Sequence, residues 1–439
     1  MHHKSRQKRR QKTSVAPPSQ VAEYQVDAIS HDARGISRKN GKVTFIAGAL
    51  SNETVEAQVY KVNRRYDEAK LISIQEASSH RIEPACPHYE ACGGCCFQHL
   101  AYPEQIAAKS HWLQGQLRKF IKEDSIEYLL DEPFHYRRRA RLSVKVYKDH
   151  SVALGFRAKG STDIVTLDTC LVLTESLQRL LPVLKKVLVE CLQPRSIGHI
   201  ELLEDDMGCS VLLRLTGVLT TNDALLWRKM AQENNLVLYL QEAKENTMVC
   251  DQDKLRTYQV EGITIRYHPQ AFIQVNSRMN NKMVAQAIAW LELQPEDKVL
   301  DLFCGVGNFT LPIAAKVASV VGVEVQEQMV ENARQNAILN RLENVTFIGA
   351  DLTKPVKKEQ LKQKFNKIVL DPPRAGAMDF LPSLIKMKAQ TILYISCDAA
   401  TLARDVEYLV SHDYRVIRVS MMEMFPQTSH VETMMLLQK

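Results

Sequence analysis

The sequence contains no run of about 18 consecutive apolar residues, which is the length that a membrane-spanning helix needs. Its basic N-terminus is not followed by an apolar segment, so the pattern of a secretory signal is missing. It has no internal repeat and no long low-complexity segment. The hydrophobic content of 45% and the charged content of 24% are ordinary for a globular protein. We therefore expect a cytoplasmic protein that does not contact a membrane.

The net charge of +7 is concentrated at one end of a 439-residue chain, a length that suits about three domains. Six basic residues without an acidic neighbour supply most of it: Lys4, Arg6, Lys8, Arg9, Arg10 and Lys12. The rest of the chain carries only +1, which predicts a disordered basic arm over residues 1–13. Such an arm either keeps the protein soluble or contacts phosphates without sequence preference.

Residues 14–78 have the pattern of a small β-domain. Four strand-like runs follow one another at short intervals, at 24–29, 43–46, 55–60 and 69–74. Asn40-Gly41 lies between two of them and is a strong hairpin signal. The pattern predicts an OB-like barrel of the kind that binds nucleic acid. Four basic residues either form an RNA-binding side of this barrel or are ordinary solvated charges: Lys61, Arg64, Arg65 and Lys70.

Residues 79–270 predict a central α+β domain that begins with a cysteine-rich loop. A helix from about 103 to 121 follows the loop, and we expect it to pack on the catalytic domain. Apolar spacing predicts two further helices, at 177–192 and 224–232. The basic run Arg137–Arg141 leads into a strand and is interpreted as an RNA contact.

From residue 271 to 439, strands alternate with helical stretches. This order predicts a parallel, Rossmann-like α/β sheet. The predicted strands are 298–303, 318–325, 345–350, 367–371, 391–396, 414–420 and 431–438. The last two are close enough in sequence to form an antiparallel pair at the edge of the sheet.

Residues just past the strand ends predict a nucleoside-binding crevice. Gly305 and Gly307 lie in the turn after the first strand, but two glycines alone are a weak signal. Acidic residues at three successive strand ends, Asp301, Glu324 and Asp351, are more specific. A carboxylate at Glu324 suits ribose hydroxyls, and Asp351 is placed to meet an adenine edge.

Two further motifs, Asp371-Pro372-Pro373-Arg374 and Ser396-Cys397, favour S-adenosylmethionine over a nicotinamide cofactor. Enzymes that methylate amino groups usually have an aromatic residue where Arg374 stands, so we expect methylation of carbon instead. Carbon-5 of uracil reacts only after a thiolate adds to carbon-6, and a base must then remove the carbon-5 proton. Cys397 offers the thiol, in a site that should favour the thiolate. Glu432 offers the base. On spacing alone, a buried core cysteine and a surface acid are the competing interpretations.

Cys86, Cys92 and Cys95 have the spacing of a metal site. Cys96 is too close to Cys95 to share the same metal, and Cys170 is a better fourth ligand. Four thiolates fit either a [4Fe-4S] cluster or zinc, and the spacing alone leaves both open.

These motifs resemble those of the RNA uracil-5-methyltransferase family. The likeness is carried by Asp301–Phe309, Asp371–Arg374, Ser396-Cys397-Asp398 and His430-Val431-Glu432, and it extends over nearly the whole chain. It is closest to the 23S ribosomal RNA branch, whose members have an OB-like TRAM domain and a [4Fe-4S] cluster. The resemblance implies methylation by S-adenosyl-L-methionine of carbon-5 of one uridine in 23S rRNA, uracil-1939. We expect a monomer without an obligate protein partner.

The resemblance assigns roles to individual residues. Cys397 would be the nucleophile and Glu432 the base. Contacts with the cofactor or target base would come from Gln274, Phe303, Asn308, Glu324, Asp351 and Asp371. The cluster ligands would be Cys86, Cys92, Cys95 and Cys170.

The chain departs from the family pattern at two places. Asp398-Ala399-Ala400 stands where the family more often has Asn-Pro-x, and Ser51-Asn52-Glu53 where TRAM domains usually have Pro-Gly-Glu. Neither departure affects a proposed catalytic side chain. A tRNA uracil-5-methyltransferase and a non-catalytic RNA-binding assembly factor are the alternative functions.

Overall fold

The computed structural model describes residues 21–122, 125–242, 248–250, 256–354, 361 and 363–439. The basic arm predicted at residues 1–13 lies outside these ranges. The chain divides into two compact units. The first runs up to Ile82 and includes His99–Ala101, and the second contains Glu83–Gln98 and Tyr102–Lys439. Within the described ranges, no helix has both the length and the apolar character needed to cross a membrane.

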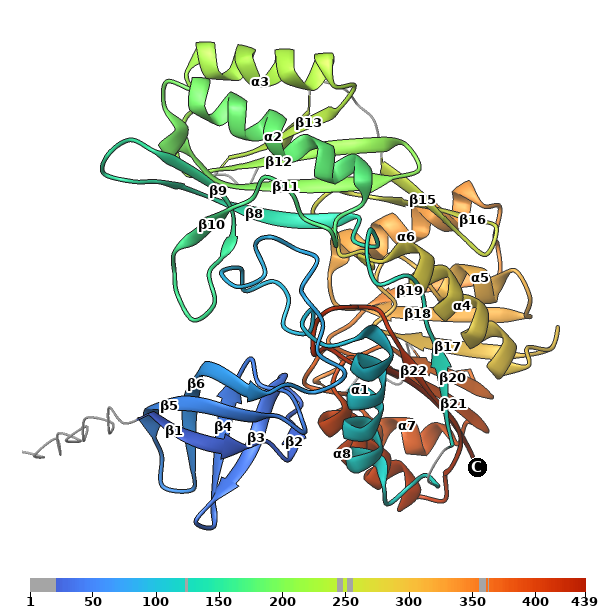
Figure 1. Ribbon diagram of the computed structural model, residues 1–439. Coiled ribbons are helices and arrows are strands. Elements are labelled where there is room, and N and C mark those ends of the chain that lie inside the picture. Colours follow the sequence, from blue (N-terminus) through green and yellow to red (C-terminus); the bar gives the residue numbers. More distant parts are fainter. Residues whose placement is uncertain (1–20, 123–124, 243–247, 251–255, 355–360, 362) are drawn as a thin grey trace, which may run out of the picture. The chain divides into compact units, whose positions relative to one another are not determined.

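The first unit is a six-stranded, barrel-like sheet with the strand order β1-β5-β6-β4-β3-β2 (Figure 1). Its strands are β1 (Val21–Gln25), β2 (Ala28–Ile29), β3 (Arg34–Lys39), β4 (Lys42–Ala47), β5 (Thr54–Val62) and β6 (Tyr66–Glu76). Asn40 and Gly41 have φ angles of 53° and 77°, which confirms the predicted tight turn between β3 and β4. Alternate residues such as Val55 and Ala57 fill the core.

The loop that departs from the TRAM pattern is fixed by Glu53. Its carboxylate is fully buried and accepts hydrogen bonds from the backbone N–H groups of Leu50 (2.8 Å) and Ser78 (3.3 Å). Arg81 adds a bidentate ion pair at 2.6 and 2.8 Å. The glutamate shared with the family pattern therefore has a structural role inside this unit.

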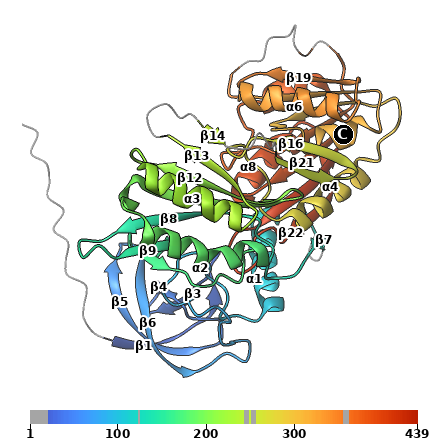
Figure 2. The same cartoon turned by 90° about the horizontal axis from the view of Figure 1, so that it is seen from above.

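The central part of the second unit is a seven-stranded sheet covered on one side by two helices (Figures 1 and 2). The strand order is β10-β9-β8-β11-β12-β13-β14. The strands are β8 (Arg139–Val146), β9 (Val152–Arg157), β10 (Ile164–Thr166), β11 (Ile197–Asp205), β12 (Gly208–Leu215), β13 (Val237–Gln241) and β14 (Met248–Cys250). The helices are α2 (Glu175–Glu190) and α3 (Thr221–Glu233), with a short 3-10 turn at Pro194–Ser196. Leu181 of α2 and Trp227 of α3 share one core with Leu213 of the sheet.

The basic run at the start of β8 is mostly used inside the protein. Arg138 is 4% exposed, donates to the backbone oxygen of Gln274 (2.9 Å), and stacks 4.7 Å from the ring centre of Tyr258. Arg139 and Arg141 both pair with the buried Glu201. The predicted RNA contact is therefore wrong for Arg138, because a buried guanidinium that is already paired has no surface to offer.

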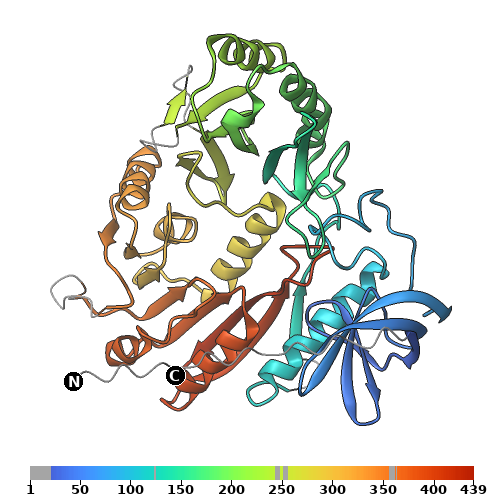
Figure 3. The same cartoon turned by 90° about the vertical axis from the view of Figure 1, so that its left-hand side faces the viewer.

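The C-terminal part is an eight-stranded sheet with the order β19-β18-β17-β20-β21-β23-β22-β7. Its strands are β17 (Lys298–Leu302), β18 (Ser319–Glu324), β19 (Val345–Gly349), β20 (Lys367–Leu370), β21 (Thr391–Ser396), β22 (Arg415–Met422), β23 (Glu432–Gln438) and β7 (Ile126–Leu129). In Figure 3 the orange and red strands of this sheet lie side by side. The predicted strands are confirmed to within two residues. The antiparallel pairing of β22 with β23 is also confirmed, but β7 pairs in parallel with β22 and forms the edge instead.

Helices cover both faces of this sheet. The helices of this part are α1 (Tyr102–Leu117), α4 (Ser277–Leu291), α5 (Thr310–Ala314), α6 (Glu327–Leu339), α7 (Leu381–Met387) and α8 (Ala399–Val410). Val299 packs with α4, α5 and α6 in one core, and its neighbour Leu300 packs with α1, α7 and α8 in another. Helix α1 therefore packs on this eight-stranded sheet. The hairpin of β15 (Arg256–Val260) and β16 (Ile263–Tyr267) contributes to the α4 side.

Candidate active site

The predicted nucleophile and base lie on neighbouring antiparallel strands. Ser396 at the end of β21 pairs with Thr433 at the start of β23. Cys397 follows the first of these residues and Glu432 precedes the second, so both are at the same edge of the sheet. Asp371 follows β20, which pairs in parallel with β21. The structure therefore brings a thiol and two carboxyl groups together at the carboxyl ends of the parallel strands.

The electrostatics of this group differ from the sequence-based expectation. Burial, with the charges of Glu432 and Asp371, raises the pKa of Cys397 to about 11 against the opposing effect of Arg374. Burial, with the charge of Asp371, also raises the pKa of Glu432 to about 8, and burial raises that of Asp371 to about 7. The predicted thiolate is therefore wrong for the site without ligand, because one exposed guanidinium does not offset burial and two acids.

Arg374 is the cation that acts on both catalytic candidates. It is exposed, and its Nη2 lies 3.4 Å from Nδ1 of His430, two residues before Glu432. Burial, with the positive charge of Arg374, lowers the pKa of His430, so this imidazole is neutral at neutral pH. Arg374 consequently places a positive charge beside the thiol and the base without a competing imidazolium.

The glycine turn after β17 forms an open cradle beside a buried carboxylate. The Gly305 N–H donates to Glu324 Oε2 (3.2 Å), and Glu324 Oε1 accepts from the N–H groups of Val325 and Gln326 (2.9 Å each). Gly305 has a φ of 55°, and a Cβ built there would meet nothing within 4 Å. The backbone is thus free to approach a ligand next to Glu324. Phe303, with a φ of 66°, enters the same turn.

Asp301 is fully buried at the floor of this turn. Thr310 donates a hydrogen bond to its Oδ2, while Oδ1 has no hydrogen-bond partner among the described residues. Burial, together with the charges of Asp371 and Glu324, raises its pKa to about 7. A group of neighbouring carboxyls with an unpaired acceptor suits a ligand that carries positive charge, as the ammonium and sulfonium of S-adenosylmethionine do.

Asn308 is held by residues that the motif does not contain. Its side-chain amide exchanges two hydrogen bonds with Asn280 of α4 (2.9 and 3.0 Å) and accepts a third from the Tyr258 hydroxyl (3.0 Å). The sequence analysis missed Asn280 and Tyr258, which precede the motif and have no local signature. They fix the orientation of Asn308 rather than leaving it to the ligand alone.

The remaining predicted contacts lie at the edges of this region. Asp351 follows β19, and its carboxylate bonds to Thr353 (2.6 Å) and Lys354 (2.8 Å). The hydrogen bond from Lys354 is the largest cause of a pKa lowered to about 2. Gln274 is half-buried and is fixed through its backbone oxygen by Arg138. Contacts of the Asp351 and Gln274 side chains with a ligand stay predictions.

Three of the clustered cysteines and one distant cysteine line a single cavity. Its volume is about 200 Å³, and its sulfur-bearing residues are Cys86, Cys92, Cys95 and Cys170. Burial raises the pKa of Cys95 to about 12 and that of Cys170 to about 11, and neighbouring thiols add to both shifts. No group of three or more His, Cys, Asp or Glu in the described ranges is placed to hold a single metal ion. The four thiols thus line a cavity and do not converge on one metal-ion position.

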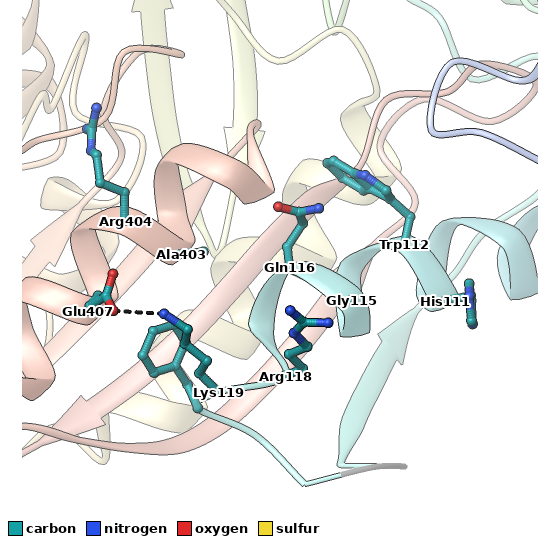
Figure 4. Close-up of a pocket in the computed structure, with 10 residues that line it drawn as sticks. His111, Trp112, Gly115, Gln116, Arg118, Lys119, Ala403, Arg404 and Glu407 are labelled. Carbon is teal, nitrogen blue, oxygen red and sulfur yellow. Dashed lines mark hydrogen bonds and ion pairs between the residues drawn. The ribbon is translucent and has the colours of Figure 1, made fainter. Parts of the chain in front are cut away.

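A larger and more open groove lies between α1 and α8 (Figure 4). It has a volume of about 620 Å³, and the ion pair of Lys119 with Glu407 (3.0 Å) links the two helices at its side. Trp112 and Gln116 contribute from α1 and Arg404 from α8. None of the predicted catalytic residues lines this groove, so size alone does not identify the reactive site.

Known proteins resemble this chain over nearly its whole length. The sequence pattern of the family described as tRNA (uracil-5-)-methyltransferase matches residues 101–439. A Marinomonas sp. (strain MWYL1) protein named 23S rRNA (uracil(1939)-C(5))-methyltransferase RlmD is 52% identical over 432 residues, which covers 98% of each chain. A protein of the same name from Shewanella sediminis (strain HAW-EB3) is 40% identical over 417 residues, which covers 94% of each.

A solved structure shares the fold. The Pyrococcus abyssi tRNA (uracil-54, C5)-methyltransferase in complex with S-adenosyl-L-homocysteine matches with a TM-score of 0.76 and 23% identity, over 94% of this chain and 99% of that chain. At this identity the match establishes the fold only. With the sequence matches beside it, this chain belongs to the tRNA (uracil-5-)-methyltransferase family.

Proposed function

We propose that this protein uses S-adenosyl-L-methionine to methylate carbon-5 of one uridine in 23S ribosomal RNA, uracil-1939 by the names of its relatives. The observation that carries the chemistry is the placement of Cys397 and Glu432 on paired strands, next to Asp371. The choice of 23S rRNA as substrate rests on the name that the relatives share. The uridine must leave its base stack to reach these groups, at a cost of a few kcal/mol.

Three residues divide the reaction between them. Cys397 first loses its thiol proton to solvent. Its Sγ then forms a bond to carbon-6 of uracil, and the electron pair of the carbon-5–carbon-6 double bond shifts to make carbon-5 nucleophilic. S-adenosyl-L-methionine supplies the methyl group from its sulfonium and leaves as S-adenosylhomocysteine. Glu432 then takes the proton from carbon-5, the bond between carbon-6 and Sγ breaks, and Cys397 departs as a thiolate. Asp371 would orient the uracil ring or the cofactor beside Cys397 and Glu432.

The cofactor would lie along the carboxyl ends of β17 and β18. Glu324 would bind the ribose hydroxyls, and Asp301 Oδ1 would accept from the ammonium group. Phe303 and Asn308 would contact the cofactor from the turn between these two acids. Gln274 and Asp351 would be the remaining residues that contact the cofactor or the target base.

Cys86, Cys92, Cys95 and Cys170 would hold a [4Fe-4S] cluster. Four thiols around a cavity fit a cubane, whose irons are bound one thiolate each, better than a single zinc bound at about 2.3 Å from each sulfur. Binding must displace the thiol protons, which burial holds in place in the absence of metal. The cluster would shape the protein rather than transfer electrons, because methyl transfer needs none.

The proposed function also assigns a role to each part of the chain. Residues 14–78 would form the TRAM domain, 79–270 the central domain and 271–439 the catalytic domain. The basic arm at 1–13 and the barrel would bind RNA flanking the target. The protein would act in the cytoplasm as a monomer.

The decisive experiment measures transfer of labelled methyl groups to unmodified 23S rRNA and to tRNA, with protein purified without oxygen. The wild type and Cys209→Ala, which alters a half-buried cysteine of β12, should both produce 5-methyluridine in 23S rRNA. Cys397→Ala should produce none. Label in tRNA alone would support the tRNA alternative, and no label in either RNA would favour a binding role.

The cluster has its own test. Iron and acid-labile sulfide should be retained in Cys96→Ala and lost in Cys170→Ala, because Cys170 lines the cavity and its alternative Cys96 does not. Equal retention in both variants would contradict the proposed ligand set.

A further inference from the structure

The loop that leads into Glu432 is buried and is held from outside the catalytic sheet. It runs through residues 423–431, between β22 and β23. Glu423 and Gln427 are 1% and 3% exposed, unusually low for polar residues in a connection. Gln427 also has a φ of 67°, a conformation that non-glycine residues adopt only when their surroundings impose it. The contacts that impose it identify what positions the base.

Those contacts come from the cysteine-rich loop. The backbone oxygen of Gln427 accepts hydrogen bonds from the N–H groups of Cys96 (3.0 Å) and Phe97 (3.1 Å). Both donors directly follow Cys95, which lines the cysteine cavity. Thr428, the residue after Gln427, lines the same cavity. The loop before Glu432 therefore contributes Thr428 to the lining of the cavity that the four cysteines share.

Gln105 of α1 connects the two loops through its side chain. Its Nε2 donates to the backbone oxygen of Phe97 (3.1 Å) and to Oε1 of Gln427 (3.0 Å). It is 1% exposed, so neither bond competes with water. A single buried amide thus joins the cysteine-rich loop to the loop that carries the base.

Further bonds hold the rest of this loop. Lys109, one turn along α1 from Gln105, pairs with Glu423 and donates to the Phe425 backbone oxygen (3.2 Å). The Tyr136 hydroxyl donates to the Pro426 backbone oxygen (3.0 Å). The bonds at Gln427 join this loop to the cysteine-rich segment, while His430, nearer to Glu432, lies 3.4 Å from Arg374.

We infer that Gln105 and Gln427 are positioning residues for Glu432, through which the cysteine cavity sets the place of the catalytic base. The inference rests on the proposed function. Addition of Cys397 and methyl transfer do not use Glu432, whereas removal of the carbon-5 proton does. A loosened loop should therefore slow the last step selectively, and the methylated RNA should accumulate as a covalent adduct on Cys397.

The test is Gln105→Met in the full-length, iron-loaded protein. Methionine keeps the length of the side chain but donates no hydrogen bond. Gln116→Met is the matched control, because Gln116 lies on the same helix and faces the open groove of Figure 4. Turnover on 23S rRNA should fall about 10- to 100-fold for Gln105→Met, as for other small displacements of a reacting group. The fraction of protein in a denaturant-resistant RNA adduct should rise and KM for RNA should fall together with turnover, because the slowed step follows adduct formation. The iron content should match that of the control.

A second variant and a second measurement cover the case in which Gln105→Met folds poorly. Gln427→Gly tolerates the positive φ, keeps the backbone oxygen that accepts from Cys96 and Phe97, and removes the side chain that Gln105 contacts, so it should cause an effect of the same kind. Hydrogen exchange without RNA should be faster across residues 423–431 in both variants than in Gln116→Met.

The inference is overturned if turnover falls without more adduct, if iron is lost together with activity, or if exchange of the loop is unchanged. Absence of methyl transfer by the wild type would instead refute the proposed function. The exchange measurement does not depend on that function.

Discussion

The ionisation of Cys397 gives the sharpest prediction. Its pKa of about 11 lies about 2.5 units above that of a free thiol at about 8.5. At pH 7.5 the thiolate fraction is then about 0.03%, against about 9% for a free thiol, a difference of about 300-fold. A more basic thiolate is more nucleophilic, with a Brønsted coefficient of about 0.4–0.5, which recovers about tenfold. Alkylation of Cys397 should therefore be about 20- to 30-fold slower than that of a free thiol.

The assay follows iodoacetamide labelling of the Cys397 peptide by mass spectrometry, from pH 7 upward and without ligand. Glu432→Gln removes a negative charge and should lower the pKa of Cys397, so labelling becomes faster. Arg374→Met removes the opposing positive charge and should slow it. Cys209 in the same sample serves as an internal control, because burial is the main cause of its own raised pKa. A labelling midpoint at or below pH 8.5 in the wild type would refute the electrostatic reasoning.

Three other predictions concern charge at separate places. Glu432 must be deprotonated to act as a base, and with a pKa of about 8 its single-turnover rate should rise between about pH 7 and 9; a flat profile would contradict this. Lys109→Met leaves the buried Glu423 without its ion-pair partner and should lower the free energy of unfolding by about 3–5 kcal/mol in denaturant titrations. Adding Glu423→Leu should restore part of this free energy. A double variant no more stable than the single variant would argue against an ion-pair cause. Burial is the largest single influence on Glu53 and opposes its ionisation, but the hydrogen bonds from Arg81 and the loop backbone, with the charge of Arg81, together outweigh it and lower the pKa. Hydrogen-exchange protection of the first unit should thus be full above the unfolded-state pKa of about 4.3 and decrease as pH falls through the lower folded value, and protection that is independent of pH would contradict this.

The central parallel strands β17, β18, β20 and β21 could be predicted closely because they are buried on both faces. Such strands are continuous β-branched and apolar runs, as in Thr391–Ser396, and their ends coincide with the first polar residue. The edge strand β7 could not be predicted in the same way. Ile126–Leu129 has only four residues, and it becomes a strand because β22, distant in sequence, offers it a free edge. A pattern local to the sequence contains no information about that partner.

The identity of the site residues could be predicted better than their charge states. The spacing placed Cys397 and Glu432 at strand ends, and the register of β21 and β23 brings them together. Their pKa values depend on burial and on Asp371, which belongs to another strand. The same limit applies to Arg138, whose basic neighbours suggest RNA although Tyr258 and a backbone oxygen already occupy it.

The order of pKa values explains how the proposed reaction restores its own starting state. The carbon-5 proton passes to Glu432, and the departing Cys397 is left as a thiolate beside a protonated carboxyl. Because the pKa of the thiol, about 11, lies above that of the carboxyl, about 8, transfer of this proton to sulfur is favourable. One proton then returns the base and the thiol to their resting forms. The same gap makes the first ionisation of Cys397 unfavourable, and a cation bound beside the carboxyl groups of Asp301 and Asp371 would offset it. By linkage, a ligand whose positive charge lowers the pKa of Cys397 binds more tightly to the thiolate form, so binding of the charged methyl donor and activation of the nucleophile reinforce each other. Once the methyl group has been transferred, S-adenosylhomocysteine has no sulfonium charge to stabilise the thiolate. Protonation of Cys397 then becomes favourable again.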